Sequence, residues 1–333
     1  MKTGLYSLVL LLAFTLMLAG CGAASNTSQP SETGAADSAP VEAAAGEVAV
    51  KDDRGEVKLE QPAKRVVVLE WTFAENLIAL GVQPVGNADN AGYNQWVTSE
   101  AALDSSVTDI GTRAEPNLEA IAALKPDLII TNSDNIPALY DQLKAIAPTI
   151  EYDPYKGNGY DYDRMVELFN NIAAAVGKEE QAKQVLADLD AHYAEAKQKL
   201  EAAGKADLHY VLTQAFTSQN AASLRMFTDN SVVVGTLSRI GMINDWTSDS
   251  IEKYGFSTVG IEALSKVQDS HFIYIVQPDD NVFGEAMKDN SVWNQLNFVK
   301  ENRTYPLAAT TWTFGGPISS KVLVDQVVET IAK

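Results

Sequence analysis

The chain contains very little cysteine and histidine. Its 333 residues include one cysteine, Cys21, and three histidines. A single cysteine allows no disulfide within the chain. His192 lies in a highly charged segment, and His209 and His271 begin predicted strands, so none stands in a loop where metal ligands would converge. We therefore expect no metal site built from protein side chains.

The sequence also lacks positive charge and recognisable catalytic motifs. Lys and Arg number 25 against 44 Asp and Glu, which gives a formal net charge of −19. This balance argues against nucleic acid or an anionic membrane surface as a partner, but a local basic pocket for a small ligand is compatible with it. The patterns G-x-S-x-G, H-E-x-x-H and G-x-G-x-x-G and a phosphate-binding loop are absent. We expect a binding protein without intrinsic cofactor, not an enzyme.

Residues 1–20 have the features of a signal peptide. Lys2 supplies a short charged region, and the apolar run Leu5–Leu18 is too short to cross a bilayer comfortably. The run ends in Leu18-Ala19-Gly20-Cys21, which resembles the lipobox of bacterial lipoproteins. That resemblance implies cleavage before Cys21 and attachment of lipid to it.

The rest of the chain divides into a tether and two predicted lobes. Residues 21–46 are rich in Ala, Ser, Gly and Glu and offer almost nothing to bury, so we expect a flexible tether with a reach of about 25–30 Å. The remaining part is long enough for two cores. We predict an N-terminal lobe at 47–160, an interlobe helix at 161–177 and a C-terminal lobe at 178–333.

One segment of the sequence occurs twice. Leu118–Ile130 (LEAIAALKPDLII) and Ile261–Ile273 (IEALSKVQDSHFI) align without a gap. Each copy has the pattern of a short amphipathic helix followed by a buried strand, and each follows a strand and a helix that ends at a glycine, Gly81 or Gly241. The repetition predicts an α/β fold of two similar lobes with mainly parallel sheets and a cleft between them. A single helical connection predicts limited hinge motion.

Aromatic and arginine side chains follow several predicted strands. In parallel α/β sheets, ligands bind beyond the carboxyl ends of the strands, so these loops are expected to face the cleft. A single Trp is more often a core residue, and Trp293 is assigned to the core, but several Trp fall in this one class of loop. The candidate lining residues are Trp71, Tyr93, Trp96, Arg113, Arg225, Phe227, Trp246, Trp312 and Phe314.

Two local expectations accompany this list. Thr72 and Glu75 have the spacing of a capping box, so Thr72 should begin a helix and Glu75 should be structural. Arg225 and Phe227 are expected in a long loop after a strand at 207–213. Aromatic walls with a few arginines suit a bulky, partly apolar, anionic ligand.

Four segments resemble the ferric-siderophore-binding lipoproteins of bacterial ABC importers: Val66–Gly86, Gly111–Ile130, Arg225–Ser231 and Thr311–Ser320. The resemblance covers essentially the whole mature chain, and it is most like the ferric citrate and hydroxamate type of Gram-positive bacteria. It implies the helical-backbone (class III) fold, with two lobes joined by one long helix. It also implies a hexadentate ferric siderophore as ligand, so that the protein itself needs no metal ligands.

The resemblance also implies roles for particular residues. Arg113 matches the pocket arginine that precedes a Glu-Pro-Asn-Leu-Glu segment, and Trp246 and Trp312 match aromatic pocket positions. Glu119 and Glu262 match the glutamates that dock onto arginines of the permease; the alternative is an interaction with the dipole at a helix start. A monomer, lipid-anchored on the extracellular face of a Gram-positive membrane, would deliver its ligand to the permease dimer.

The sequence is also compatible with other ligands and roles. Haem or cobalamin is an alternative, with Met226, Tyr93 or Tyr160 as residues that could approach a haem iron, although packing explains each of them too. A surface lipoprotein without a transport role is a further alternative. Among siderophores, citrate suits several arginines and hydroxamates suit aromatic walls, and the motifs favour citrate slightly.

Overall fold

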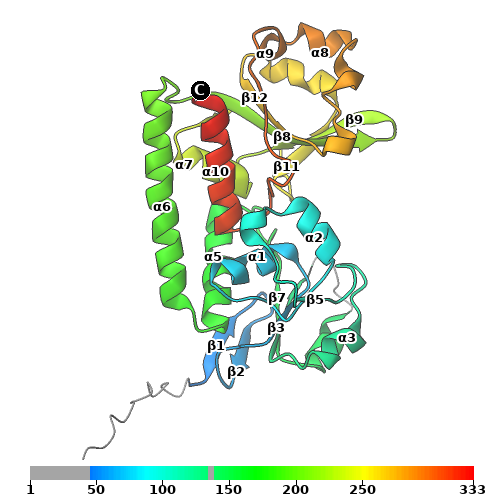
Figure 1. Ribbon diagram of the computed structural model, residues 1–333, viewed down its shortest axis with the longest axis vertical. Helices are drawn as coiled ribbons and strands as arrows, with labels where there is room; N and C mark the ends of the chain where they lie inside the picture. The colour runs from blue at the N-terminus through cyan, green and yellow to red at the C-terminus, as the bar shows by residue number, and fades with distance from the viewer. Residues whose placement is uncertain (1–45, 134–138) are drawn as a thin grey trace, which may run out of the picture. The chain divides into compact units, whose positions relative to one another are not determined.

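Two β-sheets covered by helices form the framework of the molecule (Figure 1). The computed structural model describes residues 46–133 and 139–333. The predicted signal peptide, the predicted lipidation site Cys21 and the predicted tether up to residue 45 lie outside these ranges. Within them, no helix is both long enough and apolar enough to cross a membrane.

The first sheet is parallel throughout, in the order β5-β4-β3-β6-β7. Its central strand β3 is a fully buried run of valines, as expected where helices cover both faces of a sheet. The antiparallel hairpin β1–β2 precedes it. The bounds are β1 Val48–Lys51, β2 Glu56–Leu59, β3 Val66–Val68, α1 Trp71–Ala79, β4 Gly86–Asn87, α2 Asn90–Trp96, β5 Thr108–Asp109, α3 Leu118–Ala123, β6 Leu128–Asn132, α4 Tyr140–Lys144 and β7 Thr149–Tyr152.

The second sheet has a parallel core, β10-β8-β12-β13, to which β9 and β11 add antiparallel pairs. The predicted fold class of two α/β lobes with mainly parallel sheets is confirmed. The bounds are β8 His209–Ser218, β9 Ala221–Phe227, α7 Val232–Arg239, β10 Ile243–Asn244, β11 Phe256–Val259, the 3₁₀ helix η3 Ile261–Val267, β12 His271–Ile275, α8 Ser291–Gln295, α9 Asn297–Lys300, β13 Thr304–Pro306 and α10 Pro317–Ile331.

The loop expected to hold Arg225 and Phe227 is a strand. Gln219 and Asn220 both have positive φ, which is the conformation of a two-residue hairpin turn, so β8 continues past its predicted end and returns as β9. The sequence prediction was wrong here because neither residue of this turn is glycine, the usual signal for such a hairpin.

The repeated segment occupies equivalent places in the two sheets. In the first lobe α3 leads into β6, which pairs with β3; in the second, η3 leads into β12, which pairs with β8. The second copy forms a 3₁₀ helix instead of an α-helix. It contains fewer alanines than the first copy, and alanine is the best α-helix former.

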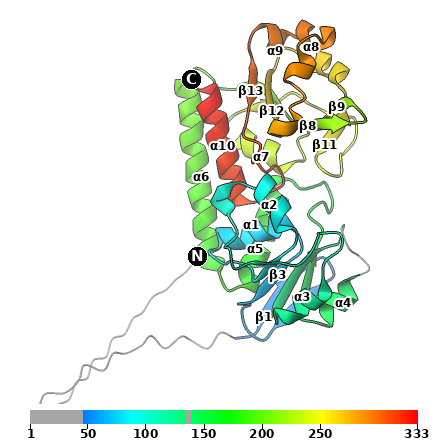
Figure 2. The same ribbon diagram turned by 45° about the vertical axis from the view of Figure 1, so that its right-hand side comes forward.

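The connection between the lobes consists of two helices. α5 (Tyr162–Ala175) packs against α1 and β1 of the first lobe, and Gly177, with φ +64°, separates it from α6 (Glu179–Ala202). α6 is the long helix, and it leads directly into β8. α10 packs along it, as Figures 1 and 2 both show. α5 also contacts α7 of the second lobe, and the interlobe helix at 161–177 stays a prediction.

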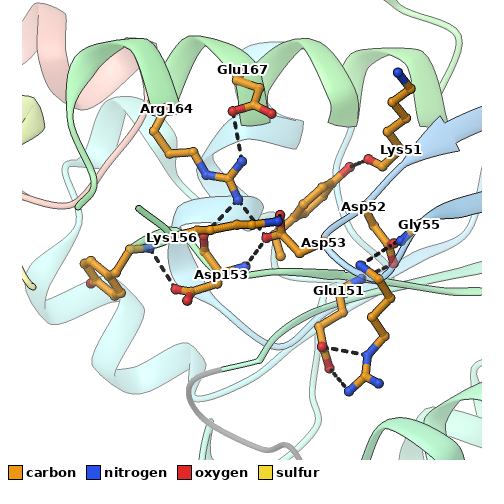
Figure 3. Close-up of polar contacts among 12 residues, drawn as sticks. Lys51, Asp52, Asp53, Gly55, Glu151, Asp153, Lys156, Arg164 and Glu167 are labelled. Atoms are coloured by element: carbon orange, nitrogen blue, oxygen red, sulfur yellow. Dashed lines mark hydrogen bonds and ion pairs between the residues drawn. The ribbon is translucent and has the colours of Figure 1, made fainter. Parts of the chain in front are cut away.

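The turn of the β1–β2 hairpin is fastened to the end of β7 and the start of α5 (Figure 3). Arg164 on α5 forms an ion pair of 2.7 Å with Asp53, which also bonds Lys156 at 2.8 Å. Burial raises the pKa of Asp53, but the hydrogen bonds from Lys156 and from the Asp153 N–H, with the charge of Arg164, hold it below its ordinary value. The loop that follows β7 contains Asp153 and leads to Tyr155, whose N–H donates to the Asp153 carboxylate at 2.8 Å.

A buried glutamate fastens the last helix to the first lobe. Glu75 on α1 accepts hydrogen bonds from the N–H groups of Gly316 (2.9 Å) and Ser319 (2.7 Å) and from the Ser319 hydroxyl (2.7 Å). These donors lie at the start of α10, where the helix dipole favours a carboxylate. The predicted capping box is therefore wrong: α1 begins at Trp71 with Glu70 as its N-cap, and Glu75 caps a different helix.

Replacing Glu75 should alter the dependence of stability on pH. Burial raises the pKa of Glu75 despite its hydrogen bonds, so the folded state holds the proton more tightly than the unfolded state. The stability from this group is therefore complete below the ordinary glutamate pKa and is lost as pH rises through the raised value. The glutamine side chain in Glu75→Gln does not titrate. The free energy of unfolding of this variant should therefore fall less than that of the wild type as pH rises through this range. Urea titrations at a series of pH values measure the difference.

The alanine variant is the matched comparison. Glu75→Ala removes all three hydrogen bonds and should lower the free energy of unfolding by about 2–4 kcal/mol at neutral pH, since buried donors are left unpaired. Parallel pH profiles for wild type and Glu75→Gln would contradict the raised pKa.

Candidate ligand-binding site

A cavity of about 330 Å³ is lined by residues of both lobes. Its size falls within the usual range for small-molecule sites. The first lobe contributes a carboxylate, an arginine and polar groups, and the second contributes an arginine and most of the aromatic rings. The lining residues are Glu70, Thr72, Arg113, Asn132, Tyr155, Arg225, Tyr254, Phe256, Trp312 and Phe314.

The first-lobe residues lie where parallel-sheet topology predicts a site. Glu70 follows β3, Asn132 ends β6 and Tyr155 follows β7, and these three strands are neighbours in the sheet. The carboxyl ends of adjacent parallel strands meet at one edge, so their side chains converge there.

Arg113 lies between an aromatic ring and a carboxylate. Its guanidinium carbon is 3.9 Å from the centre of the Trp71 ring, and its Nη1 is 2.9 Å from the Glu70 carboxylate. The side chain remains 35% exposed, whereas that of Glu70 is only 8% exposed. The stacking and the ion pair fix the guanidinium while leaving donor groups for a ligand.

The loop that carries Arg113 is shaped by a glycine. Gly111 has φ +93°, and a Cβ at this position would lie 2.9 Å from the Glu115 carbonyl oxygen. Gly111 also pairs with Pro116 as an isolated β-bridge. The loop is therefore a tight closed turn that holds Arg113 over Trp71.

Arg225 approaches the cavity from β9 of the second lobe. Its Nη1 donates to the Gln214 side-chain oxygen at 3.0 Å, and its guanidinium lies 5.0 Å from the Phe256 ring and 5.1 Å from the Phe216 ring. Burial lowers the pKa of Arg225, but an arginine stays protonated in proteins. No described carboxylate forms an ion pair with it, so its charge is available to a ligand.

A continuous series of aromatic contacts, the aromatic belt, runs along the cavity, and all of its rings except Trp71 line the cavity. The centroid distances are 5.4 Å from Trp71 to Trp312, 5.3 Å from Trp312 to Phe314, 6.0 Å from Phe314 to Phe256, 6.2 Å from Phe256 to Tyr254 and 4.8 Å from Tyr254 to Tyr155. The belt begins and ends in the first lobe and passes through the second, so it couples the two walls of the cavity.

The segment that carries Trp312 and Phe314 is hydrogen-bonded to the first lobe. The Thr72 hydroxyl donates to the Phe314 carbonyl at 2.7 Å, and the Tyr160 hydroxyl donates to the Gly315 carbonyl at 3.1 Å. Glu75 holds the next residues, as described above. This wall of the cavity is therefore positioned before any ligand arrives.

The structure brings together part of the predicted set. The cavity is lined by four of the predicted residues: Arg113, Arg225, Trp312 and Phe314. The ring of Trp71, a fifth, stacks against the Arg113 guanidinium. Phe227 is buried directly behind the lining, 5.9 Å from Phe256 and 6.1 Å from Phe314 between ring centroids.

Three predicted residues lie elsewhere. Tyr93 is buried and its hydroxyl donates to the Ala101 carbonyl at 2.7 Å; Trp96 is half-buried at the end of α2. Trp246 packs in a second apolar core, with Nε1 bonded to Ser257 at 3.2 Å. Tyr254 and Phe256, which flank the start of β11, occupy the second-lobe wall instead.

Several lining residues were missed by sequence reasoning. Glu70, Asn132 and Tyr155 follow strands, so the rule that found the arginines applies to them as well. Tyr254 and Phe256 lie in a segment without a clear hydrophobic period, and only the antiparallel pairing of β11 with β9 brings them to the cavity.

The three residues considered as haem ligands are buried and make hydrogen bonds or packing contacts within the protein. Tyr93 and Tyr160 are buried with bonded hydroxyls, and burial raises the pKa of both well above the ordinary value, which disfavours a phenolate ligand. Met226 is buried in the second core. None of the three lines the cavity.

Within residues 46–133 and 139–333, no group of three or more His, Cys, Asp or Glu side chains is placed to hold a metal ion. His192 and His209 pair with Asp325 and Asp245, and His271 stacks on Tyr305.

A larger cavity, of about 660 Å³, lies between the β1–β2 hairpin and the α4–β7 region. Its lining residues all belong to the first lobe. We take the smaller cavity as the site because both lobes and both cavity arginines meet there.

Glu119 and Glu262 occupy equivalent positions. Each lies in the first turn of its helix, α3 or η3, and each is exposed. Neither carboxylate forms an ion pair with a described residue, so both are accessible to a partner.

Two α/β lobes with a cavity shared between them define a bilobed ligand-binding protein. The chain belongs to the periplasmic binding protein family, whose model matches residues 66–311. It is 32% identical to the Fe(3+)-citrate-binding protein YfmC of Bacillus subtilis, over 97% of this chain and 95% of that protein. It is 28% identical to the probable siderophore-binding lipoprotein YfiY of the same organism, over 98% of each chain.

Solved structures show the same likeness. The siderophore-binding protein FhuD from Vibrio cholerae, bound to Fe3+–Desferal, superimposes with a TM-score of 0.72 at 29% identity, covering 81% of this chain and 98% of that one. The family and these neighbours support the predicted fold and a substrate-binding role.

Proposed function

We propose that this chain is the substrate-binding component of an ABC importer and captures a ferric siderophore in the cavity between its lobes. The observation that carries the proposal is the pairing of two arginines with the aromatic belt in one cavity shared by the lobes. Relatives named for ferric citrate and siderophore binding, and a structural neighbour holding Fe3+–Desferal, support it.

The chemistry of the ligand explains why such a cavity suffices. A hexadentate siderophore fills every coordination position of Fe(III), so the protein contacts only the outside of the complex. Arg113 and Arg225 donate hydrogen bonds to its charged oxygens, each contributing about 1.5–3 kcal/mol. The rings of the belt cover its hydrocarbon, at roughly 25 cal/mol per Å² buried. No step of this task requires catalysis or a resident cofactor.

Further parts of the proposal concern the setting of the protein. Lipidation of Cys21 would hold the monomeric protein on the extracellular face of the membrane, and the tether would let it reach the permease. Glu119 and Glu262, one on each lobe, are proposed to contact arginines on the two halves of the permease dimer.

Ferric complexes should quench the tryptophan fluorescence of the protein saturably. The expected cause is the approach of an absorbing Fe(III) chelate to Trp312 and Trp71. A titration should compare ferric citrate, a ferric hydroxamate, a ferric catecholate, haem and cobalamin. Trp312→Phe should reduce the quenched amplitude more than Trp293→Phe, whose indole lies in the second core. Saturable quenching by haem or cobalamin alone would replace the ferric siderophore as ligand, and no quenching at all would support a non-transport lipoprotein.

Arg113→Ala should weaken the binding of the preferred ferric complex by about tenfold or more, because it removes a charged donor and breaks the ion pair with the buried Glu70 carboxylate. Isothermal titration calorimetry measures the effect. Arg113→Lys keeps the charge but loses the flat stacking on Trp71. Its affinity for the ferric complex should therefore lie between those of the wild type and Arg113→Ala. Wild-type affinity in the alanine variant would remove Arg113 from the site.

The double variant Glu119→Ala/Glu262→Ala should bind ligand normally and support less uptake. Both carboxylates are exposed and outside the cavity, so only contact with the permease should suffer. Uptake of ⁵⁵Fe-labelled complex by cells provides the measurement. The control is Glu60→Ala/Glu329→Ala, which removes two other exposed glutamates. Lost ligand affinity in the first double variant, or equal uptake in both, would contradict the docking role.

A further inference from the structure

We propose that Glu70 sets the charge selectivity of the cavity, so that it prefers ferric trihydroxamates of low net charge to polyanionic ferric citrate. The inference rests on the proposed function and specifies its ligand class. It departs from the slight preference for citrate that the sequence motifs indicate.

The charged groups among the described lining residues are Glu70, Arg113 and Arg225. The Glu70 carboxylate is almost completely buried and lies 2.9 Å from the Arg113 guanidinium. It is also held by the Trp71 N–H at 2.9 Å, so it cannot easily turn away when a ligand enters. Much of the positive charge of Arg113 is therefore already offset inside a low-dielectric site.

Arg225 supplies the remaining positive charge. Its hydrogen-bond partner Gln214 is neutral, and its neighbours Phe216 and Phe256 are aromatic. The described lining thus presents about one uncompensated positive charge. A ligand with several negative charges would find one cation to meet it and one carboxylate to repel it.

The aromatic belt also disfavours ligands with several negative charges. The face of an aromatic ring carries negative charge density, which attracts cations and repels anions. Trp312, Phe314, Phe256 and Tyr254 form the aromatic part of the cavity lining that the second lobe contributes. Such a wall suits hydrocarbon or a positive group better than a carboxylate.

Ligand chemistry then separates the two candidate classes. Three deprotonated hydroxamates balance the charge of Fe(III), and the methylene chains that join them provide apolar surface for the belt. In ferric citrate the carboxylates exceed the charge of the iron and there is little hydrocarbon. The cavity matches the first kind of complex in both charge and apolar surface.

A matched series of ligands tests this directly. Ferric desferrioxamine B carries one positive charge on its free amine; acetylation of the amine makes the complex neutral, and succinylation gives it one negative charge. Dissociation constants for these three and for ferric citrate would be measured with wild type, Glu70→Gln and Glu60→Gln. Glutamine keeps an acceptor for the Trp71 N–H but removes the charge, and Glu60 is exposed and outside the cavity.

The wild type should bind the amine and acetylated complexes more tightly than the succinylated one, and ferric citrate most weakly. Glu70→Gln should improve the affinity for the succinylated complex and for citrate by roughly tenfold relative to the amine complex. Glu60→Gln should leave these ratios unchanged, although it changes the net charge of the protein equally.

The possible results distinguish a failure of ferric-siderophore binding from a failure of charge selection by Glu70. If the wild type binds none of the complexes, the proposed function fails. If it binds citrate as tightly as the hydroxamates, or if folded Glu70→Gln keeps the wild-type ratios, only the charge selection is overturned. Should Glu70→Gln prove unfolded by circular dichroism, the wild-type series decides, and affinities independent of ligand charge overturn the inference.

Discussion

The attachment of the segment Trp312–Ser319 to helix α1 is the constraint on which the rest of the site depends. Glu75, Thr72 and Tyr160 of the first lobe bind this segment by hydrogen bonds to its backbone and to Ser319. Most of these acceptors and donors are buried, where an unpaired polar group is costly. The start of α10 and the aromatic wall of the cavity are therefore fixed relative to α1.

The same attachment explains how two lobes form one cavity. Arg113 and Glu70 lie on the first lobe beside α1, and Arg225 and Phe256 approach from the antiparallel strands of the second. Trp312 and Phe314 bridge the two groups through the aromatic belt. A single apolar core also contains residues of both lobes, including Phe73, Leu212 and Leu323. This continuity favours small adjustments around a ligand over wide opening of the lobes.

Charge in the cavity is controlled by a few buried contacts despite the strongly acidic chain. Glu70 offsets Arg113, while Arg225 has only neutral partners among the described residues. We propose that local pairing of this kind, not the net charge of −19, determines which ferric complex is accepted.

Sequence patterns predicted the lobes and part of the cavity, and the reasons for the limits are physical. The repeat at Leu118 and Ile261, the valine run of β3 and the strand-end rule depend on local periodicity, so the sheets, Arg113 and Trp312 could be inferred. Tyr254 and Phe256 depend on the pairing of β11 with β9, which is a long-range contact without a local signal. Trp246 was misplaced because an aromatic residue near a cleft loop and one in the core have the same local pattern, and only packing distinguishes them.

The most direct test of the central claim is the position of iron in crystals grown with ferric desferrioxamine B, measured from anomalous scattering at the iron absorption edge. The account predicts a single strong peak within the aromatic belt, with the chelate oxygens facing Arg113 and Arg225. A peak in the cavity between the β1–β2 hairpin and α4, or no ordered iron in a complex that forms in solution, would contradict it.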